Sequence, residues 1–444
     1  MRSPKPTPFL AGLLLFAAAS GAAQQAQPVR LTLEGAIQRG LQAHLRVLAA
    51  ETRVEEAAAA RERRFAHLLP RTRAEAVANL QNRNLAAFGI SFPGVPEVVG
   101  PFSNYDFRVY GEVPLFDRQS YHAWKASERL IASVEQDSRD ARDTIVRLVA
   151  GLYLSAQAAG ARVEAAQSRV TTAEALHRLA VERRHARVAT GVDVLRAQVE
   201  LANAQQRLLE ARNAARQARL VLARNIGLSP GTLLELAEPL AFRLLEAPPP
   251  LVALREALAR RADYLSLLAQ REALVAQQKA SRARYLPRLS ISGSYGFLGR
   301  SVGDVRGTGL LQAGLSLTVV DRDRQGEQRE LESRLRRLDH QIADLRLEVE
   351  LELREALLTL ESAAEEVAVA RQGLSLAERE LELARERFQA GVANNIEVIS
   401  AQSSVARAQE NHILAVVRHT DAKMALVRAL GAAEQNYRRY LEQP

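Results

Sequence analysis

The sequence predicts a mainly α-helical chain with a membrane β-barrel part, in which long helical hairpins alternate with pairs of strands. Three observations predict it: two long intervals without proline, four segments in which apolar and polar residues alternate, and an internal duplication. Because proline interrupts helices, intervals of this length are expected to hold long helices. Alternation with a period of two is typical of a strand that has one apolar face.

Residues 1–23 have the organisation of a secretory signal peptide. Arg2 and Lys5 precede an apolar run over residues 9–19, and small residues follow at 21–23. A membrane anchor is the alternative, but a helix that crosses a bilayer needs about 20 apolar residues, and this run is shorter. We therefore expect an exported protein from which this segment is removed.

Composition excludes several classes of site. The chain has no cysteine, which excludes disulfides, thiolate metal sites and a lipid anchor on cysteine. No segment after the signal peptide is expected to be an apolar transmembrane helix, so a closed β-barrel remains as the membrane-spanning structure. The net charge of +9 comes with only 5% aromatic residues, which favours solvated helix surfaces over a nucleic-acid interface.

Long paired helices are predicted from Pro114 to Pro230 and from Pro287 to Pro444. Apolar residues repeat there at spacings of three and four, which is the pattern of paired helices and also of an ordinary helical bundle. One predicted seam contains Leu201, Ala204, Leu208, Ala211, Ala215, Ala218 and Leu222. The other contains Leu331, Leu335, Leu338, Ile342, Leu345, Val349, Leu353 and Leu357.

Four strands are predicted over residues 72–80, 105–115, 289–297 and 311–319, each with one apolar and one polar face. In an exported protein these faces suit outer-membrane lipid on one side and a water-filled lumen on the other. A soluble sandwich has the same alternation, so the interpretation depends on the export signal. The side chains predicted to face lipid are Tyr105, Phe107, Val109, Ile291, Tyr295, Leu311, Leu315 and Leu317.

The chain carries an internal repeat. Residues 188–198 (VATGVDVLRAQ) correspond to residues 392–402 (VANNIEVISAQ) at an offset of 204 positions, which also relates Asp117 to Asp321. Upstream, Pro70 corresponds to Pro287 at an offset of 217, so the first half has the longer loop between its strands. Each half reads as helix, strand, loop, strand, long helix, tip and long helix.

The repeat gives each chain four strands. Four strands cannot enclose a pore, so several chains must contribute to one barrel. The repeat also divides the chain into segments. The segments are residues 24–230 for the first repeat, 231–250 for a proline-rich linker, 251–431 for the second repeat and 432–444 for a C-terminal tail.

This arrangement resembles the TolC family of outer-membrane efflux ducts over about residues 31–431. The resemblance is carried by LTLEGAI at 31–37, the Leu-Pro-Arg before the first strand of each half, PLFD at 114–117 and the repeated tip motif ending Asp-Val-Leu-x-Ala-Gln. It implies a homotrimer whose twelve strands form one outer-membrane barrel, continued by an α-helical barrel through the periplasm. It also implies a periplasmic adaptor at the tips and an inner-membrane transporter of the RND or ABC type.

The resemblance assigns roles to residues at the two tips. The predicted adaptor-docking residues are Arg187, Val188, Gly391 and Val392; the family usually has glycine where Arg187 stands. The predicted periplasmic constriction contains Phe388, Asp193, Glu397 and Ser400. Glu397 takes the place of an acidic ring residue, and Phe388 and Ala393 stand for a tyrosine and an arginine that hold the family's entrance closed. Glu397 also has capping-box spacing from Asn394, so both roles stay open.

No catalytic, cofactor-binding or metal-ligating residue is predicted. No HExxH, GxSxG, GxGxxG or Walker-type sequence occurs. His340 and His419 are expected on wetted helix surfaces, and carboxylates such as Glu348 and Glu352 are expected to be solvated or ion-paired. A passive export duct is thus the leading function. The alternatives are a periplasmic adaptor, which needs a lipoyl-like β-domain, and a structural coiled-coil protein, which needs no strands.

Overall fold

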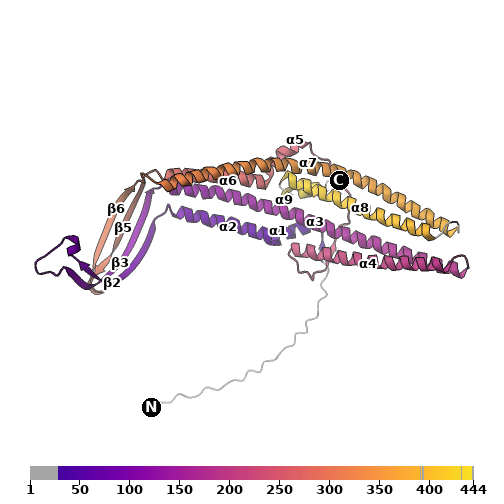
Figure 1. Ribbon diagram of the computed structural model, residues 1–444, viewed down its shortest axis with the longest axis horizontal. Coiled ribbons are helices and arrows are strands. Elements are labelled where there is room, and N and C mark those ends of the chain that lie inside the picture. The colour runs from indigo at the N-terminus through magenta and orange to yellow at the C-terminus, as the bar shows by residue number, and fades with distance from the viewer. Residues whose placement is uncertain (1–28, 391, 393–394, 432, 443–444) are drawn as a thin grey trace, which may run out of the picture.

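The chain is long and narrow, with a β-sheet at one end and two helical hairpins at the other (Figure 1). The computed structural model describes residues 29–390, 392, 395–431 and 433–442. The signal peptide predicted for residues 1–23 lies outside the described residues, as do Gly391, Ala393 and Asn394 at the second tip.

One pattern of elements occurs twice. Helices α3 (Arg118–His185) and α7 (Arg322–Gln389) have 68 residues each and stand 204 positions apart. The same offset separates the starts of α4 (Gly191–Asn225) and α8 (Asn395–Leu430). The 217-residue offset relates the remaining helix pairs, which are α1 (Leu33–Ala43) with α5 (Pro250–Arg260) and α2 (Leu45–Ala66) with α6 (Ala262–Ala283).

Repeated caps and glycines fix where these helices begin and end. Asp117 accepts a hydrogen bond from the Ser120 N–H at 2.9 Å, and Asp321 accepts one from the Asp323 N–H at 3.1 Å. Gly227 and Gly431 follow α4 and α8 with φ of +72° and +78°. A Cβ at Gly227 would lie 2.3 Å from that of Ala43, so glycine is required both by the backbone and by the close approach of α1.

The four long strands form one antiparallel sheet in the order β2-β3-β5-β6. Their bounds are β2 (Arg71–Asn84), β3 (Val98–Phe116), β5 (Arg288–Gly299) and β6 (Val305–Ser316), with a short 3₁₀ helix, η1 (Ala86–Phe88), between β2 and β3. Each half contributes one hairpin, and the halves join where β3 pairs with β5. Strands β2 and β6 are the two edges.

The helices follow a matching order beside the sheet. Near the sheet the neighbours run α2-α3-α6-α7, and toward the tips they run α4-α3-α8-α7. Both predicted seams are confirmed, because every residue assigned to them is buried or half-buried. Alanines such as Ala204 and Ala215 are 1% and 4% exposed, which lets α3 and α4 pack closely.

The largest core cluster lies midway along the molecule, where α1, α3, α4, α8 and α9 (Ala433–Glu442) meet. Tyr153 is fully buried there, and its hydroxyl donates to the Leu31 carbonyl oxygen at 3.0 Å. Leu31 ends β1 (Val29–Leu31), which pairs in parallel with β4 (Leu234–Leu236). Residues 231–250 therefore include a strand that closes this core, and residues 433–442 form a helix that covers it.

The last strand is displaced from its predicted position. We expected it over residues 311–319, but β6 runs from Val305 to Ser316, and Leu317 lies beyond its end. The final pair joins Ser316 to Arg288. The next residue opposite would be Pro287, which has no N–H to donate, so the ladder ends and the assignment of Leu317 to the strand is wrong.

One helix meets the length and composition of a membrane span, contrary to our expectation from the sequence. An 18-residue window within α3 is long and apolar enough to cross a bilayer. Half of that window is buried inside the chain's own packing, as in the core helix of a helical bundle. Its apolar residues serve the central cluster, to which α3 contributes Ile145, Val149 and Tyr153.

Candidate functional site

The sheet register places seven of the eight predicted lipid-facing side chains on one face, Leu317 being the exception. Directly paired residues of an antiparallel sheet have side chains on the same face, as do alternate residues of one strand. Val109 pairs with Tyr295, and Ile291 pairs with Ala313, so one face is continuous across β3, β5 and β6. Its side chains are Tyr105, Phe107, Val109, Ile291, Tyr295, Leu311 and Leu315.

Much of this apolar face is exposed in the part of the chain that the structure describes. Leu311, Leu315 and Tyr295 are 80%, 71% and 64% exposed. An exposed patch of large apolar side chains marks a surface that contacts a membrane or another protein.

The opposite face of the sheet is polar and charged. Glu75 pairs with Arg108, and Ser292 pairs with Gln312. The Nε of Arg108 lies 2.9 Å from an oxygen of Asp106, and the guanidinium of Arg73 lies 4.7 Å from the centre of the Tyr110 ring. This face suits contact with water, so the two-sided pattern read from the sequence is present in the folded sheet.

The first tip joins α3 to α4 through a tight turn. Arg187 has φ of +62°, the left-handed conformation that glycine adopts without strain. The Val188 N–H donates to the Arg183 carbonyl oxygen at 2.8 Å, and Val188 is 66% exposed. The position where the family usually has glycine thus has glycine-like geometry, although the residue is arginine.

The second tip closes in the same way. The Val392 N–H donates to the Arg387 carbonyl oxygen at 3.1 Å, a bond related to that of Val188 by the 204-residue repeat. Val392 is 71% exposed. Two valines therefore stand at equivalent, accessible positions on the two tips.

Two of the predicted constriction residues lie near helix starts. Asp193 forms a capping box with Thr190, and the hydrogen bonds from the Thr190 hydroxyl and N–H lower the pKa of its carboxyl. An oxygen of Glu397 lies 3.4 Å from the Nε of Arg387, and Ser400 is exposed. The cap predicted between Glu397 and Asn394 falls on a residue outside the described part of the chain.

Phe388 joins the two hairpins. Its ring is 6% exposed in a cluster with Leu176 and Ala180 of α3 and Val398 of α8. Sequence reasoning missed its partner: the guanidinium of Arg183 lies 4.6 Å from the ring centre and donates to the Phe388 carbonyl oxygen at 2.6 Å. A cation–π contact and a hydrogen bond thus connect α3 to α7 close to the tips.

One histidine prediction is wrong. His340 is exposed as expected, but His419 is fully buried, and its ring lies 4.6 Å from that of Phe242. The segment after β4 crosses α8 here, with Leu240 packed on the neighbouring cluster. Burial, reinforced by nearby Lys423, lowers the pKa of His419 to about 4. Lys423 is also buried, and its pKa is lowered to about 8 for the same reason.

Ion pairs of buried and half-buried side chains hold the middle of the helical layer. The guanidinium of Arg261 is 3% exposed, contacts Asp263 at 2.6 Å and pairs with Glu352 of α7. Arg428 of α8 lies 2.5 Å from Asp140 of α3. In the described part of the chain, no group of three or more metal-ligating side chains could hold an ion. The pairs of Arg261 with Glu352 and of Arg428 with Asp140 link different helices.

Solved structures with this fold are outer-membrane channels. The outer-membrane channel OprN aligns with a TM-score of 0.77 at 20% identity, covering 97% of this chain and 98% of its own. The outer membrane protein VceC from Vibrio cholerae aligns with a TM-score of 0.77 at 19% identity, covering 90% of this chain and 96% of its own. The chain thus shares the fold of these outer-membrane channels.

The sequence comparisons define the family. The family model described as "Outer membrane efflux protein" matches residues 36–228 and 253–432, so the chain belongs to the outer membrane efflux protein family. The pyoverdine export outer membrane protein OpmQ of Pseudomonas aeruginosa is 26% identical over 420 residues, which cover 92% of this chain and 87% of that protein. The outer membrane protein OprJ of the same organism is 29% identical over 340 residues, 72% of this chain and 68% of its own. The resemblance to TolC-type ducts is confirmed.

Proposed function

We propose that this chain is the exit duct of a tripartite efflux or secretion system, passively conducting small molecules or exported cargo across the outer membrane. Three copies contribute four strands each to a twelve-stranded barrel and continue it as a helical tube through the periplasm. An adaptor docks at the tips, and an inner-membrane transporter of the RND or ABC type supplies cargo. Residues 1–23 are a signal peptide, and the mature chain carries no lipid.

The single observation that carries this proposal is that both the sheet and the helical layer have two open edges. The sheet ends at β2 and β6, and the helical layer toward the tips ends at α4 and α7. An unpaired strand edge is a site for pairing with another chain. Strands of 12 to 19 residues are also long enough to span a bilayer, which takes about 9–11 residues.

Exposed apolar stripes on the edge helices support closure by further copies. The exposed apolar residues on α4 include Val192, Leu195, Val199, Leu209 and Leu220. On α7 they include Leu347, Leu351, Leu358, Val369, Leu376 and Leu383. Successive members are 3, 4, 10 and 11 residues apart on α4 and 4, 7 or 11 residues apart on α7, so each set lies along one side of its helix. The α4 edge of one copy packing on the α7 edge of the next would cover both.

The named relatives support an export role. OpmQ is named for pyoverdine export, and it aligns with 92% of this chain. The tips support the adaptor site, because Val188 and Val392 are exposed between α3 and α4 and between α7 and α8. The ends of these two hairpins lie farthest from the sheet (Figure 1). The polar face of the sheet supports a hydrated lumen, with the apolar face toward lipid.

Fractionation tests the duct against its alternatives. A duct is expected in the outer-membrane fraction as a detergent-stable oligomer that migrates faster or slower after heating. A periplasmic adaptor or a structural coiled coil would be recovered without a heat-modifiable barrel. Recovery of the full-length protein in the soluble periplasm, with no heat-dependent change in migration, would overturn the proposal.

A further inference from the structure

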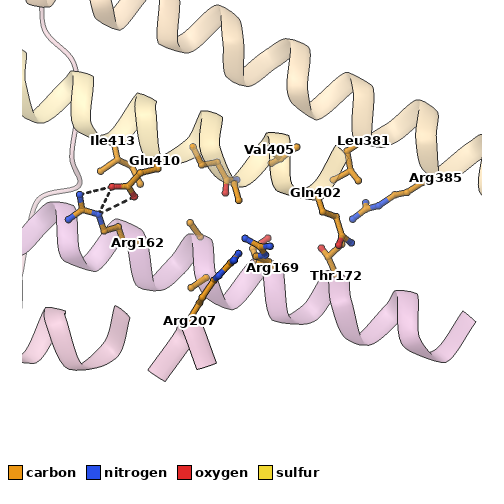
Figure 2. Close-up of a pocket in the computed structure, with 15 residues that line it drawn as sticks. Arg162, Arg169, Thr172, Arg207, Leu381, Arg385, Gln402, Val405, Glu410 and Ile413 are labelled. Carbon is orange, nitrogen blue, oxygen red and sulfur yellow. Dashed lines mark hydrogen bonds and ion pairs between the residues drawn. The ribbon is translucent and has the colours of Figure 1, made fainter. Parts of the chain in front are cut away.

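The groove between the two helical hairpins holds a cavity of about 320 Å³ (Figure 2). Its walls come from α3 and α4 of the first repeat and from α7 and α8 of the second. Glu410 is the one carboxylate among its lining residues, against four arginines: Arg162, Arg169, Arg207 and Arg385. The cavity therefore has an excess of positive charge.

Two of these arginines have carboxylate partners. Arg162 donates to Glu410 from Nε at 3.0 Å and from Nη2 at 2.7 Å, and Arg169 donates from Nη2 to Glu200 at 2.7 Å. Across the described residues, no ion pair joins Arg207 or Arg385 to a carboxylate. Arg385 extends from α7 toward Gln402 and Thr172 (Figure 2). Two arginines at the cavity thus have no carboxylate partner among the described residues.

Buried polar atoms around the same cavity also lack partners. Gln402 is 4% exposed, and neither Oε1 nor Nε2 of its amide has a hydrogen-bond partner among the described residues. The Nε of Arg169 is buried without an acceptor as well. A buried polar group left unpaired costs about 1–3 kcal/mol, so three such atoms around one cavity indicate a place where a ligand binds.

The internal repeat provides a comparison within the chain. The positions 204 residues away from the four arginines are Glu366, Gly373, Asn411 and Val181. None of them is basic. The four arginines of this groove are therefore not repeated at the equivalent positions of the other half.

We propose that this groove binds a small oxyanion, either of the phosphate type or a multivalent carboxylate. Arg207 and Arg385 supply the positive charge, and the Nε of Arg169 and the Gln402 amide supply buried N–H donors. Guanidinium groups match the oxygens of both anion types with paired hydrogen bonds. Because the donors come from both hairpins, the bound anion links the first repeat to the second.

Calorimetric titration of the purified full-length protein in detergent tests this site, with inorganic phosphate and citrate as the probes at constant ionic strength. Each of Arg385→Gln and Gln402→Leu is expected to weaken binding at least about tenfold, the loss of one charge-assisted hydrogen bond. Arg379→Gln is the matched control, because Arg379 is an exposed arginine on the same helix outside the cavity. Binding of phosphate, of citrate or of both supports the proposal and identifies the anion class.

The proposal is overturned if neither anion binds the wild type, or if Arg385→Gln and Gln402→Leu bind as tightly as Arg379→Gln does. Thermal unfolding in the absence of anion shows whether each variant is folded. Arg207→Gln replaces any variant that is not, since Arg207 is exposed. The outcome is separable from the duct proposal, because a protein without this site would still be recovered as an outer-membrane oligomer.

Discussion

Arg187 occupies the left-handed region at the first tip, where a side chain is strained. Glycine relieves this strain, so Arg187→Gly is expected to leave assembly intact and to raise the free energy of unfolding by up to about 1 kcal/mol. Urea unfolding in detergent measures the change. Arg178→Gly, at an exposed position inside α3, should instead lower stability by about 0.5–1 kcal/mol. Equal destabilisation by both changes would contradict the account of the tip.

Gly227, unlike Arg187, is a glycine that the fold requires. A Cβ there would meet Ala43 at 2.3 Å, and the backbone is left-handed. Gly227→Ala should therefore lower the free energy of unfolding by at least about 1–2 kcal/mol. Gly191→Ala is the control, because a Cβ at Gly191 meets nothing within 4 Å. If neither substitution lowers the melting temperature, α1 and α4 do not meet as described.

His419 makes stability depend on pH. Its pKa is lowered to about 4 in the folded chain, from an ordinary value of 6.5, so the unfolded chain takes up the proton first. Stability is therefore present above pH 6.5 and is lost as the pH falls toward 4, by up to about 3 kcal/mol. His419→Phe should flatten this part of the profile, measured as melting temperature against pH. An unchanged slope in that variant would exclude His419 as the cause.

For single residues, local contacts are easier to predict from the sequence than contacts between distant segments. The caps at Asp117, Asp321 and Asp193 involve partners within three residues, so such contacts lie within reach of local sequence patterns. The burial of His419 and the contact of Arg183 with Phe388 depend on segments distant in the chain. Helical periodicity on α8 does not reveal that the segment around Phe242 crosses it.

At the scale of elements, substitutions at two neighbouring residues can test the assignment of the two faces of the sheet. Leu311 lies on the apolar face, and Gln312 follows it on the polar face of the same strand. In a barrel with lipid outside, Leu311→Arg should cost about 2–4 kcal/mol near mid-bilayer, whereas Gln312→Arg points into water. The yield of heat-modifiable oligomer in outer membranes compares them. Equal assembly of the two variants would mean that the lipid-facing assignment is wrong.

Alternation identified all four long strands, but their ends depended on pairing. β3 begins at Val98, before the predicted start at Tyr105, because Val98 and Val99 pair with Asn84 and Arg83 of β2. β6 begins at Val305, where it pairs with Gly299. Partners of this kind are set by the register of the sheet, and a single strand's pattern does not contain them.

At the scale of the whole molecule, the duplication allowed the most complete prediction. The offset of 204 residues relates α3 to α7 and α4 to α8 along their lengths. It did not reveal how the halves join, which is through β3 with β5 and through α3 with both α6 and α8. The number of copies and the partners were implied only by the resemblance to the family, and they remain proposals.

The repeat also predicts how one copy meets the next. Within one chain α3 packs on α8, and Arg162 of α3 forms an ion pair with Glu410 of α8. If the layer continues around a ring, α7 of one copy packs on α4 of the next in the same way. The positions equivalent to this pair are then Glu366 on α7 and Gln206 on α4. They should be adjacent across the boundary between copies.

Disulfide cross-linking of the double variant Glu366→Cys, Gln206→Cys tests this most directly, since the natural chain has no cysteine. Non-reducing gels of outer membranes should show linked dimers and trimers and nothing larger, while each single variant shows no such ladder. A ladder that continues beyond three chains, or a correctly localised double variant that remains monomeric under oxidising conditions, would contradict the closed trimeric duct.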